Sequence, residues 1–574
     1  MSIKKRTKKE FSFGKFGGVD HTRNHSAPDR AEGIVNFRLL PDGSLSRREG
    51  IRHFATLSGN IRAVCESMAG GAFSLLVLAG NTVSAVNPES GAVTPMGTVG
   101  TSEGDACFFY LKDELYIADG SGIYRYDGNS FVSATGYIPT VGVGWPCGET
   151  GKLYEPRNIL NRRGRITYLV NNAYLPYLCA GESIEGVEAV YVNGILRSAS
   201  DYSIDTLFNA VVIPTLKEGD TVDVRFIFKD TYASLRNRMF ASTSAALFGD
   251  VNGIRIFLCG GGTSGKVFQS RLVTEAQLFE SRKIYPESDP LYFPAGSEFD
   301  VCNGTNSATA MLRYGSKLLI FTDGDVWMVS SDGTEGAQTT GVNSHIGCPV
   351  AHGAVISDND PFSIGRHAVW RWSEASLSEK TCKAENISSP IDSCLGESRL
   401  KDCVIFYNPT AGELWLHCKQ DGITWIYGID SGAWYSFEGF SGNKFFDMDG
   451  KVGFYRENKI FIFDESLIRD VDENGTEKDI SATYISGIAD PEDGKTRTLS
   501  RIALRGDLEG EAVTLEFIPH GCSKEVYVLK DNGTEEHSLI QKRTSSGRFK
   551  YGSFKLTASS NARQHIHGIT LTAR

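Results

Sequence analysis

The residues from Gly260 to Lys266 have the spacing of a phosphate-binding loop, in which backbone N–H groups and a lysine surround nucleotide phosphates. The next residue is Val267, at the position where that motif needs a hydroxyl to bind magnesium. The sequence then continues as VFQSRLV, which favours a strand where the motif needs a helix. We therefore interpret this segment as a glycine-rich turn between two strands.

A nucleophile-elbow pattern, Gly-x-Ser-x-Gly, runs from Gly100 to Gly104. That elbow exposes its serine at a strained turn between a strand and a helix. Strand-like sequence lies on both sides of Ser102, so no helix is available to complete the elbow. We interpret the pattern as a loop between strands.

The segment DVDENG, from Asp470 to Gly475, begins like an EF-hand calcium loop. The twelfth position of such a loop is a bidentate glutamate, and here it is Ser481. We predict an exposed acidic linker, and weak calcium binding by residues 470–481 is the alternative.

Two histidine pairs have spacings that could suit a metal ion: His21 with His25, and His565 with His567. Metal sites need three or four converging ligands, and neither pair has a third ligand at a suitable spacing. We predict no metal and no cofactor.

Glycan-cleaving propellers need two positioned carboxylates, and sialidase-type propellers usually repeat a Ser-x-Asp-x-Gly-x-Thr-Trp box. The segment CKQDGITW, which ends at Trp425, comes nearest to that box. In it Asp421 and Gly422 are adjacent, and the sequence has no second copy. We therefore predict that the protein is not an enzyme.

The composition is that of a globular protein, with 574 residues, 41% hydrophobic and 22% charged. We expect it to fold in the cytoplasm, because no signal peptide follows the basic MSIKKRTKKE and no run approaches the ~18 apolar residues of a membrane span. The twelve cysteines form no CxxC pair, and we expect them to be reduced and mostly buried. The net charge of −10 disfavours tight binding to a nucleic-acid backbone.

Short hairpins recur along the chain, each an apolar strand, a polar or glycine-containing turn and a second strand rich in aromatic or β-branched residues. Such hairpins are typical of the inner strands of propeller blades, since radial repetition buries many short strands without long exposed edges. Separate sandwiches are the alternative. Three clear copies start at Leu75, Leu115 and Leu318, and four weaker ones at Ile256, Ser363, Leu414 and Lys451.

The predicted fold class is all-β: an irregular six- or seven-bladed β-propeller with an inserted small β-domain and a C-terminal β-sandwich. Only ASLRNRMFAS and TEAQLFESRK come near a helical period, and both are short. The insertion is indicated by VYVNG, whose Asn193-Gly194 pair suits a tight hairpin turn. The predicted parts are 1–50, an N-terminal docking arm; 51–140, the first part of the propeller; 141–231, the inserted β-domain; 232–465, the second part of the propeller; and 466–574, the C-terminal β-sandwich.

The segment from Phe16 to Gly50 resembles the opening of many phage tail and connector proteins, where a Gly-Gly-Val-Asp-like segment leads to an Asn-Phe pair, then to Asp-Gly and a basic pair before a first propeller strand. The DPLYFP segment from Asp289 is similar to one in podophage nozzle proteins, also called tail tubular protein B. The VYVNG insertion and the closing RQHIHGITLTAR are similar to parts of related tail proteins. In the first segment the matching residues are Gly17, Gly18, Val19, Asp20, Asn36, Phe37, Asp42, Gly43, Arg47, Arg48 and Gly50.

The resemblance implies a non-enzymatic structural subunit of a phage tail, in a nozzle or head-to-tail connector ring that forms part of the DNA ejection conduit. It implies a homo-oligomer, expected to be a hexamer, assembled in the host cytoplasm and located in the virion. The implied partners are the adaptor and portal complex and the tail fibres or tail tip, with double-stranded DNA passing through without specific binding. An acidic lumen would let the DNA slide, because it repels phosphates.

The N-terminal segment is too polar and glycine-rich to form a core of its own, so we expect it to dock on a neighbouring subunit or on the adaptor. A plain first strand with a frayed tip is the alternative.

The alternative function is a receptor- or glycan-binding propeller of the tail tip, and an exposed cluster of Trp370, Trp372, Trp425 and Trp434 would favour it. A glycan-degrading propeller is a weaker alternative. The predicted docking residues are Phe16, Gly17, Gly18, Asp20, Arg23, Asn36, Phe37, Arg47 and Arg48.

Overall fold

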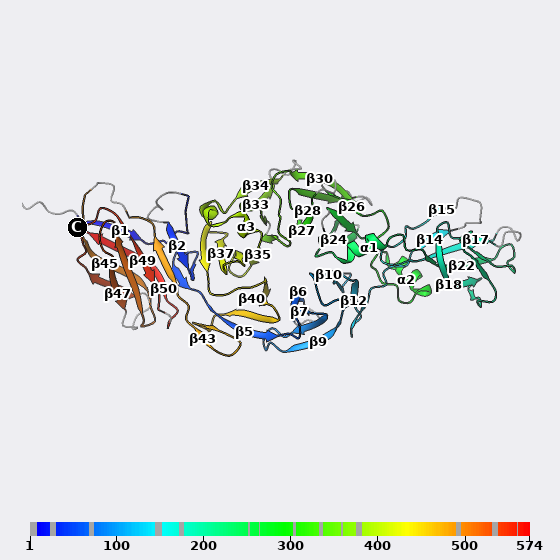
Figure 1. The fold of residues 1–574 in the computed structure, drawn as a ribbon, viewed down its shortest axis with the longest axis horizontal. Helices are drawn as coiled ribbons and strands as arrows, with labels where there is room; N and C mark the ends of the chain where they lie inside the picture. The colour runs from blue at the N-terminus through cyan, green and yellow to red at the C-terminus, as the bar shows by residue number, and fades with distance from the viewer. Residues whose placement is uncertain are drawn as a thin grey trace, which may run out of the picture. The chain divides into compact units, whose positions relative to one another are not determined.

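The fold of the chain is all-β, as predicted, in a computed structural model that is built almost entirely from short antiparallel strands (Figure 1). Within the described residues, no helix has both the length and the apolar composition needed to cross a bilayer. The structure describes residues 8–22, 30–67, 74–143, 152–170, 177–250, 253–262, 265–301, 306–331, 337–357, 360–374, 382–489, 495–530, 538–559 and 561–574.

Within the described residues, five four-stranded sheets and four-stranded parts of two larger sheets follow one another along the chain, each with neighbouring strands in meander order. This is the unit from which propeller blades are made. The strands, sheet by sheet, are β6 (Ile61–Ser67), β7 (Ser74–Ala79), β8 (Thr82–Val86) and β9 (Val93–Thr98); β10 (Cys107–Leu111), β11 (Glu114–Ala118), β12 (Ile123–Tyr126) and β13 (Phe131–Ser133); β23 (Ser244–Asp250), β24 (Gly253–Cys259), β25 (Lys266–Gln269) and β26 (Phe299–Asp300); β27 (Ala308–Tyr314), β28 (Lys317–Thr322), β29 (Val326–Ser331) and β30 (Ala337–Asn343); β31 (Ala354–Ser357), β32 (Asp360–Ile364), β33 (Val369–Glu374) and β34 (Cys382–Asn386); β35 (Cys403–Asn408), β36 (Glu413–Cys418), β37 (Ile423–Gly428) and β38 (Ala433–Phe437); and β39 (Lys444–Met448), β40 (Lys451–Arg456), β41 (Lys459–Asp464) and β5 (Gly50–Thr56).

Each of the seven predicted hairpins forms the two central strands of one of these sheets. The central strands are the most buried because they pack on both faces, which explains why their apolar pattern is visible in the sequence. The last sheet differs from the others, because its fourth strand is β5 from the early part of the chain. Antiparallel pairing of β5 with β41 thus ties an early segment to a late one.

The chain divides into two compact units. In the first, apolar side chains of β5, β6, β7, β39, β40 and β41 share one core. In the second, β10 to β12 pack against β24 and β25, and β24 and β25 pack against β27 to β29. The first unit comprises Met1–Ala79, Ala85–Thr94 and Asn343–Arg574, and the second comprises Gly80–Ser84 and Pro95–Val342.

The described residues between 140 and 228, in the second unit, form two sheets around a separate core rich in valine, isoleucine and phenylalanine side chains. Asn193 and Gly194 both have positive φ, 53° and 77°, and join β18 to β19 in the tight turn that their sequence favours. The strands are β14 (Thr140–Val143), β15 (Lys152–Leu153), β16 (Arg163–Leu169), β22 (Thr221–Phe228), β18 (Ile184–Val192) and β19 (Ile195–Leu196) in one sheet, and β17 (Tyr177–Cys179), β21 (Ala210–Val212) and β20 (Ser203–Asp205) in the other.

The C-terminal part of the first unit is a sandwich of two sheets, in which Phe13 meets Phe554 edge to face at 4.9 Å. One sheet contains β1 (Lys9–Phe13), β3 (Phe37–Leu39), β4 (Leu45–Arg47), β50 (His565–Ala573), β45 (Leu499–Asp507) and β48 (Ser538–Arg543). The other contains β2 (Ala31–Val35), β44 (Thr483–Ser486), β49 (Gly552–Thr557), β46 (Ala512–Pro519) and β47 (Glu525–Lys530), and β2 also pairs with β38.

The N-terminal segment therefore contributes four strands, β1 to β4, to the sandwich. The expectation of a separate docking arm is wrong for the described part of residues 1–50. The segment is indeed too polar for a core of its own, but its few apolar side chains enter the core that the C-terminal strands build.

Short helical segments connect some of the strands. The two sequences nearest a helical period form α1 (Ala233–Phe240) and α2 (Glu275–Ile284), and Thr274 and Gln277 form a capping box at the start of α2. The others are the 3₁₀ turn η3 (Ser389–Cys394) and α3 (Glu397–Leu400), and a hairpin of β42 (Asp470–Val471) and β43 (Glu477–Lys478) lies beside β5.

Candidate functional site: the N-terminal segment and its charge network

The first predicted docking residues pack against their own chain. Phe16 is buried and meets Tyr484 edge to face at 4.9 Å, and Val19 N–H donates to the carbonyl of Trp434 at 2.8 Å. Gly18 lies so close to this strand that a Cβ would stand 2.7 Å from the Trp434 nitrogen, so a side chain does not fit there. Gly17 is half-buried beside it.

Asp20 ends this contact with a local turn, because its Oδ1 accepts the N–H and the hydroxyl of Thr22 at 2.9 and 2.6 Å. Arg23, which we also predicted to dock on a partner, lies outside the described residues.

Asn36 and Phe37 lie where β2 leads into β3. Asn36 has a φ of 57°, and its Oδ1 accepts from Arg48 Nε at 3.0 Å and from the Glu438 N–H at 2.8 Å. Its Nδ2 donates to the Ser481 carbonyl at 2.9 Å. The side chain thus satisfies main-chain groups that would otherwise be buried without partners, while Phe37 is completely buried.

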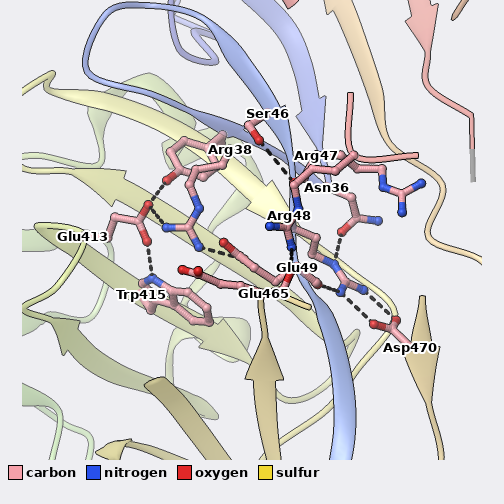
Figure 2. A network of polar contacts seen from close by, with 12 residues as sticks. Asn36, Arg38, Ser46, Arg47, Arg48, Glu49, Glu413, Trp415, Glu465 and Asp470 are labelled. Carbon is pink, nitrogen blue, oxygen red and sulfur yellow. Dashed lines mark hydrogen bonds and ion pairs between the residues drawn. The ribbon is translucent and has the colours of Figure 1, made fainter. Parts of the chain in front are cut away.

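Arg48 is 1% exposed and makes a bidentate ion pair with Asp470, with N–O distances of 2.8 and 2.7 Å (Figure 2). Asp470 Oδ1 also accepts the Ile51 N–H at 3.0 Å. At Gly50 the Arg469 carbonyl oxygen would stand 2.1 Å from a Cβ, so only glycine lets the two segments approach. Arg48 and Gly50 of the motif therefore join β5 to the hairpin β42–β43.

Arg47 is 2% exposed and bonds to carbonyl oxygens, donating to Ser559 and Ile468. Its Nε has no hydrogen-bond partner within the described residues. Burial, with repulsion from Arg48, lowers the pKa of Arg47 to about 10. Arg47 thus links β4 to the end of the sandwich without a carboxylate partner among its hydrogen bonds.

A second ion cluster, which sequence reasoning missed, centres on Arg38 of β3. Its guanidinium lies between Glu49 and Glu413, and Glu413 also accepts from the Tyr435 hydroxyl and from Trp415 Nε1 (Figure 2). Burial alone would lower the pKa of Arg38, but the two carboxylates outweigh it and raise the pKa. Although burial opposes ionisation of Glu49, Arg38 keeps the pKa of Glu49 below its ordinary value.

The arrangement holds distant strands together through bonds within the chain. Both oxygens of Glu413 accept bonds from groups of the same chain, and Asp470 is held by Arg48 and a main-chain N–H. The predicted interaction residues are thus brought together, but inside the protein.

The DPLYFP segment forms a second polar cluster, in the second unit. Asp289 is 1% exposed and accepts the Gly136 and Leu291 N–H groups at 2.8 and 3.0 Å. Burial raises the pKa of Asp289 to about 6 although these bonds oppose the shift. Asn158 Nδ2 donates to the carbonyls of Tyr137 and Leu291, and its Oδ1 accepts the Phe293 N–H at 3.1 Å.

The rejected motifs have local structural roles. Lys266 begins strand β25 and pairs with Asp300 at 2.9 Å, while Thr263 and Ser264 of the glycine-rich turn lie outside the described residues. Asp472 Oδ1 accepts main-chain N–H groups of its own hairpin turn. Within the described residues, no group of three or more His, Cys, Asp or Glu side chains could hold a metal ion.

The tryptophans proposed as a glycan-binding cluster belong to the interior. Trp372 and Trp434 are completely buried, Trp425 is 7% exposed, and Trp370 is half-buried. The feature that would have favoured a glycan-binding propeller is therefore missing from these four positions.

The expectation that all cysteines are reduced is wrong at one position, because Cys179 is disulfide-bonded. Nine described cysteines are free, and six of them are buried as predicted. The sequence shows no CxxC pair, and this is why the disulfide was missed.

No family model and no curated protein matches this sequence. Among solved structures, the AfRom2 CNH domain is 7% identical, with a TM-score of 0.33 over 72% of this chain and 99% of that domain. An exo-β-1,3-galactanase from Phanerochaete chrysosporium is 12% identical, with a TM-score of 0.20 over 58% of this chain and 83% of the galactanase chain. At these TM-scores neither likeness bears on function.

Proposed function

We propose that this chain is a non-enzymatic structural subunit of a bacteriophage tail, in a nozzle or head-to-tail connector ring around the DNA ejection path. The observation that carries the proposal is the structural role of the resembling residues. Gly18, Asn36, Arg48 and Gly50 each make a contact that another residue type would not reproduce, so the resemblance rests on positions with demanding roles.

The acidic charge also supports this proposal. Each chain carries a net charge of −10, so a hexamer would carry a net charge of about −60. This charge suits a channel through which DNA must slide without binding.

The proposed ring needs a contact surface, and we place it on the inserted β-domain rather than on the buried N-terminal segment. Asp205 Oδ1 accepts the N–H groups of Leu207 and Phe208, and this turn leaves their side chains 82% and 61% exposed. Ile195 and Leu196 of β19 are 65% and 60% exposed. Exposed apolar side chains mark candidate interaction sites, and the proposed occupant of this domain's exposed apolar positions is a neighbouring copy of this chain.

The test is negative-stain microscopy with mass determination of the purified protein, alone and mixed with the adaptor and portal proteins encoded beside it. We expect rings with an open channel, formed either alone or only with the adaptor. The double variant Leu207→Ser with Phe208→Ser should prevent ring formation, while Ile254→Ser, which changes an exposed apolar residue elsewhere in the same unit, should not. A protein that stays monomeric with every partner would contradict the proposed function.

A further inference from the structure

A pocket of about 400 Å³ lies beside the N-terminal charge network, within the first unit. The hairpin β42–β43 forms one wall, and aromatic residues on and before β40 and β41 form the floor. Its volume is in the range of pockets that hold small ligands. Nothing in the proposed structural role requires this pocket.

The floor is apolar and flat. Phe454 and Phe461 lie almost parallel, with ring centroids 5.3 Å apart, and Phe440 lies 5.4 Å from Phe454. Phe454 and Phe461 are 2% and 6% exposed, and the Arg456 guanidinium lies over the Phe461 ring at 5.5 Å, so half-buried Phe440 offers the aromatic surface that a ligand can reach. Such a floor favours a ligand with one flat, weakly polar face.

The rim of the pocket carries two positively charged side chains that form no ion pair within the described residues. Arg456 and Lys478 line the pocket, and neither has an ion-pair partner among the described residues. By contrast, the lining acids Asp470 and Glu477 are paired with Arg48 and Arg469, each at 2.7 Å.

Hydrogen-bonding groups complete the rim. Ser441 and Thr476 bring hydroxyl groups, and Asp472 uses Oδ1 for its own turn. A bound anion would therefore meet two cations that form no ion pair among the described residues and one carboxylate, Asp472, whose charge is partly offset by Lys459.

We propose that this pocket binds an acidic sugar, a pyranose ring that carries one carboxylate, such as a uronic acid of a surface polysaccharide. The less polar face of the ring lies against Phe440, the carboxylate pairs with Arg456 and Lys478, and the ring hydroxyls bond to Ser441, Thr476 and Asp472. A single carboxylate suits this rim better than a phosphate does, because the higher negative charge of a phosphate would be repelled more strongly by Asp472. The pocket binds without catalysis, because the acids around it are ion-paired or bonded to a turn.

The experiment measures the affinity of the full-length chain for glucuronate, with glucose as the matched ring without a carboxylate and benzoate as a flat carboxylate without hydroxyls. We expect glucuronate to bind about tenfold more tightly than either, since a hydrogen-bonded ion pair in a partly enclosed site contributes roughly a factor of ten. Equal affinity for glucose would overturn the role of the cations. Equal affinity for benzoate would overturn the sugar assignment.

Variants locate the binding to this pocket. Arg456→Gln and Lys478→Gln should each weaken glucuronate binding by about three- to tenfold, because each removes one charged partner and keeps a long side chain. Lys451→Gln is the matched control, since it removes an exposed cation from the same strand as Arg456 but outside the pocket. Unchanged affinity in both pocket variants, or no binding of glucuronate at all, would overturn the proposal. Neither outcome bears on ring assembly.

Discussion

Two of the segments that carry the tail-protein resemblance hold the chain together by different chemistry. In the first unit, the N-terminal segment uses arginines paired with carboxylates from distant strands, as in Arg48 with Asp470. In the second unit, Asp289 of the DPLYFP segment bonds to main-chain N–H groups. Asn158, from another part of the chain, bonds to main-chain groups of the segment. The first cluster depends on opposite charges that must be buried together, whereas the second depends on one carboxylate whose hydrogen bonds go to main-chain N–H groups, with Arg125 offsetting only part of its charge.

This difference predicts which substitutions reduce the stability of the protein most. A buried ion pair is costly to break by removing one partner, because the other charge then lacks compensation. A side chain bonded to main-chain groups instead fixes local geometry, and its loss leaves neutral groups unsatisfied. We therefore expect larger effects from changes in the N-terminal segment than in DPLYFP.

The largest effect is expected from removing residues 1–49, which deletes strands β1 to β4. The C-terminal sandwich would lose four of its strands and expose the core around Phe554 and Tyr484, so it should unfold while the sheets of the second unit persist. Limited proteolysis with mass spectrometry should then show early cleavage between residues 480 and 574. Deletion of residues 1–7, which removes no described strand, is the control. A shortened protein with a protease-resistant sandwich would instead support a separable docking arm.

Glu413→Ala should have the next largest effect. It leaves Arg38 buried with only Glu49 as partner and leaves Tyr435 and Trp415 without their acceptor. We expect the free energy of unfolding of the first unit to fall by about 3–5 kcal/mol. Urea unfolding measures it.

The matched control for this change is Glu397→Ala. Glu397 forms an exposed pair with Lys401 at 3.2 Å, and its loss should change the free energy of unfolding little, because solvent screens such a pair. Equal effects of the two substitutions would show that the Arg38 cluster contributes no more than a surface pair does.

Local patterns made much of the fold predictable. Each central hairpin shows its period of two within about fifteen residues, and the Asn193-Gly194 turn needs only its own two residues. The four N-terminal strands were missed because their partners lie far along the chain. Arg48, for example, is 422 residues from Asp470, and nothing near Arg48 indicates that it is buried.

The same reasoning explains what was missed at the candidate site. Charged residues such as Arg38 and Glu413 usually lie on the surface, so their types alone predict exposure. Only the assembled sheets show that β3 and β36 bring them together. The pairing of Cys179 and the pocket beside β42–β43 likewise depend on contacts that no local pattern encodes.

The smallest effect, and the one that separates the two clusters most clearly, is the pH dependence of stability. Asp289 has an ordinary pKa of 3.8, and burial raises it to about 6 in the folded protein. The folded state therefore holds this proton more tightly than the unfolded state, so stability of the second unit should fall as pH rises from about 4 to about 6, by at most about 3 kcal/mol. Glu49 should have the opposite effect on the first unit, because Arg38 lowers the pKa of Glu49 against the effect of burial. The contribution of Glu49 to stability is present above its ordinary pKa of 4.5 and is lost as the pH falls below it.

Urea unfolding at pH values from 4 to 7, followed by proteolysis that assigns fragments to each unit, measures both slopes. Asp289→Asn should remove the slope of the second unit between pH 4 and 6 and leave that of the first unit unchanged. The asparagine has one acceptor oxygen for two main-chain N–H groups, so the variant should be less stable than the original protein at pH 4. The relevant result is therefore the change of stability with pH and not the stability at one pH. The slope of the second unit could survive this substitution. In that case another buried acid, such as Glu155 with its raised pKa, causes the pH dependence of stability, and Asp289 of DPLYFP does not.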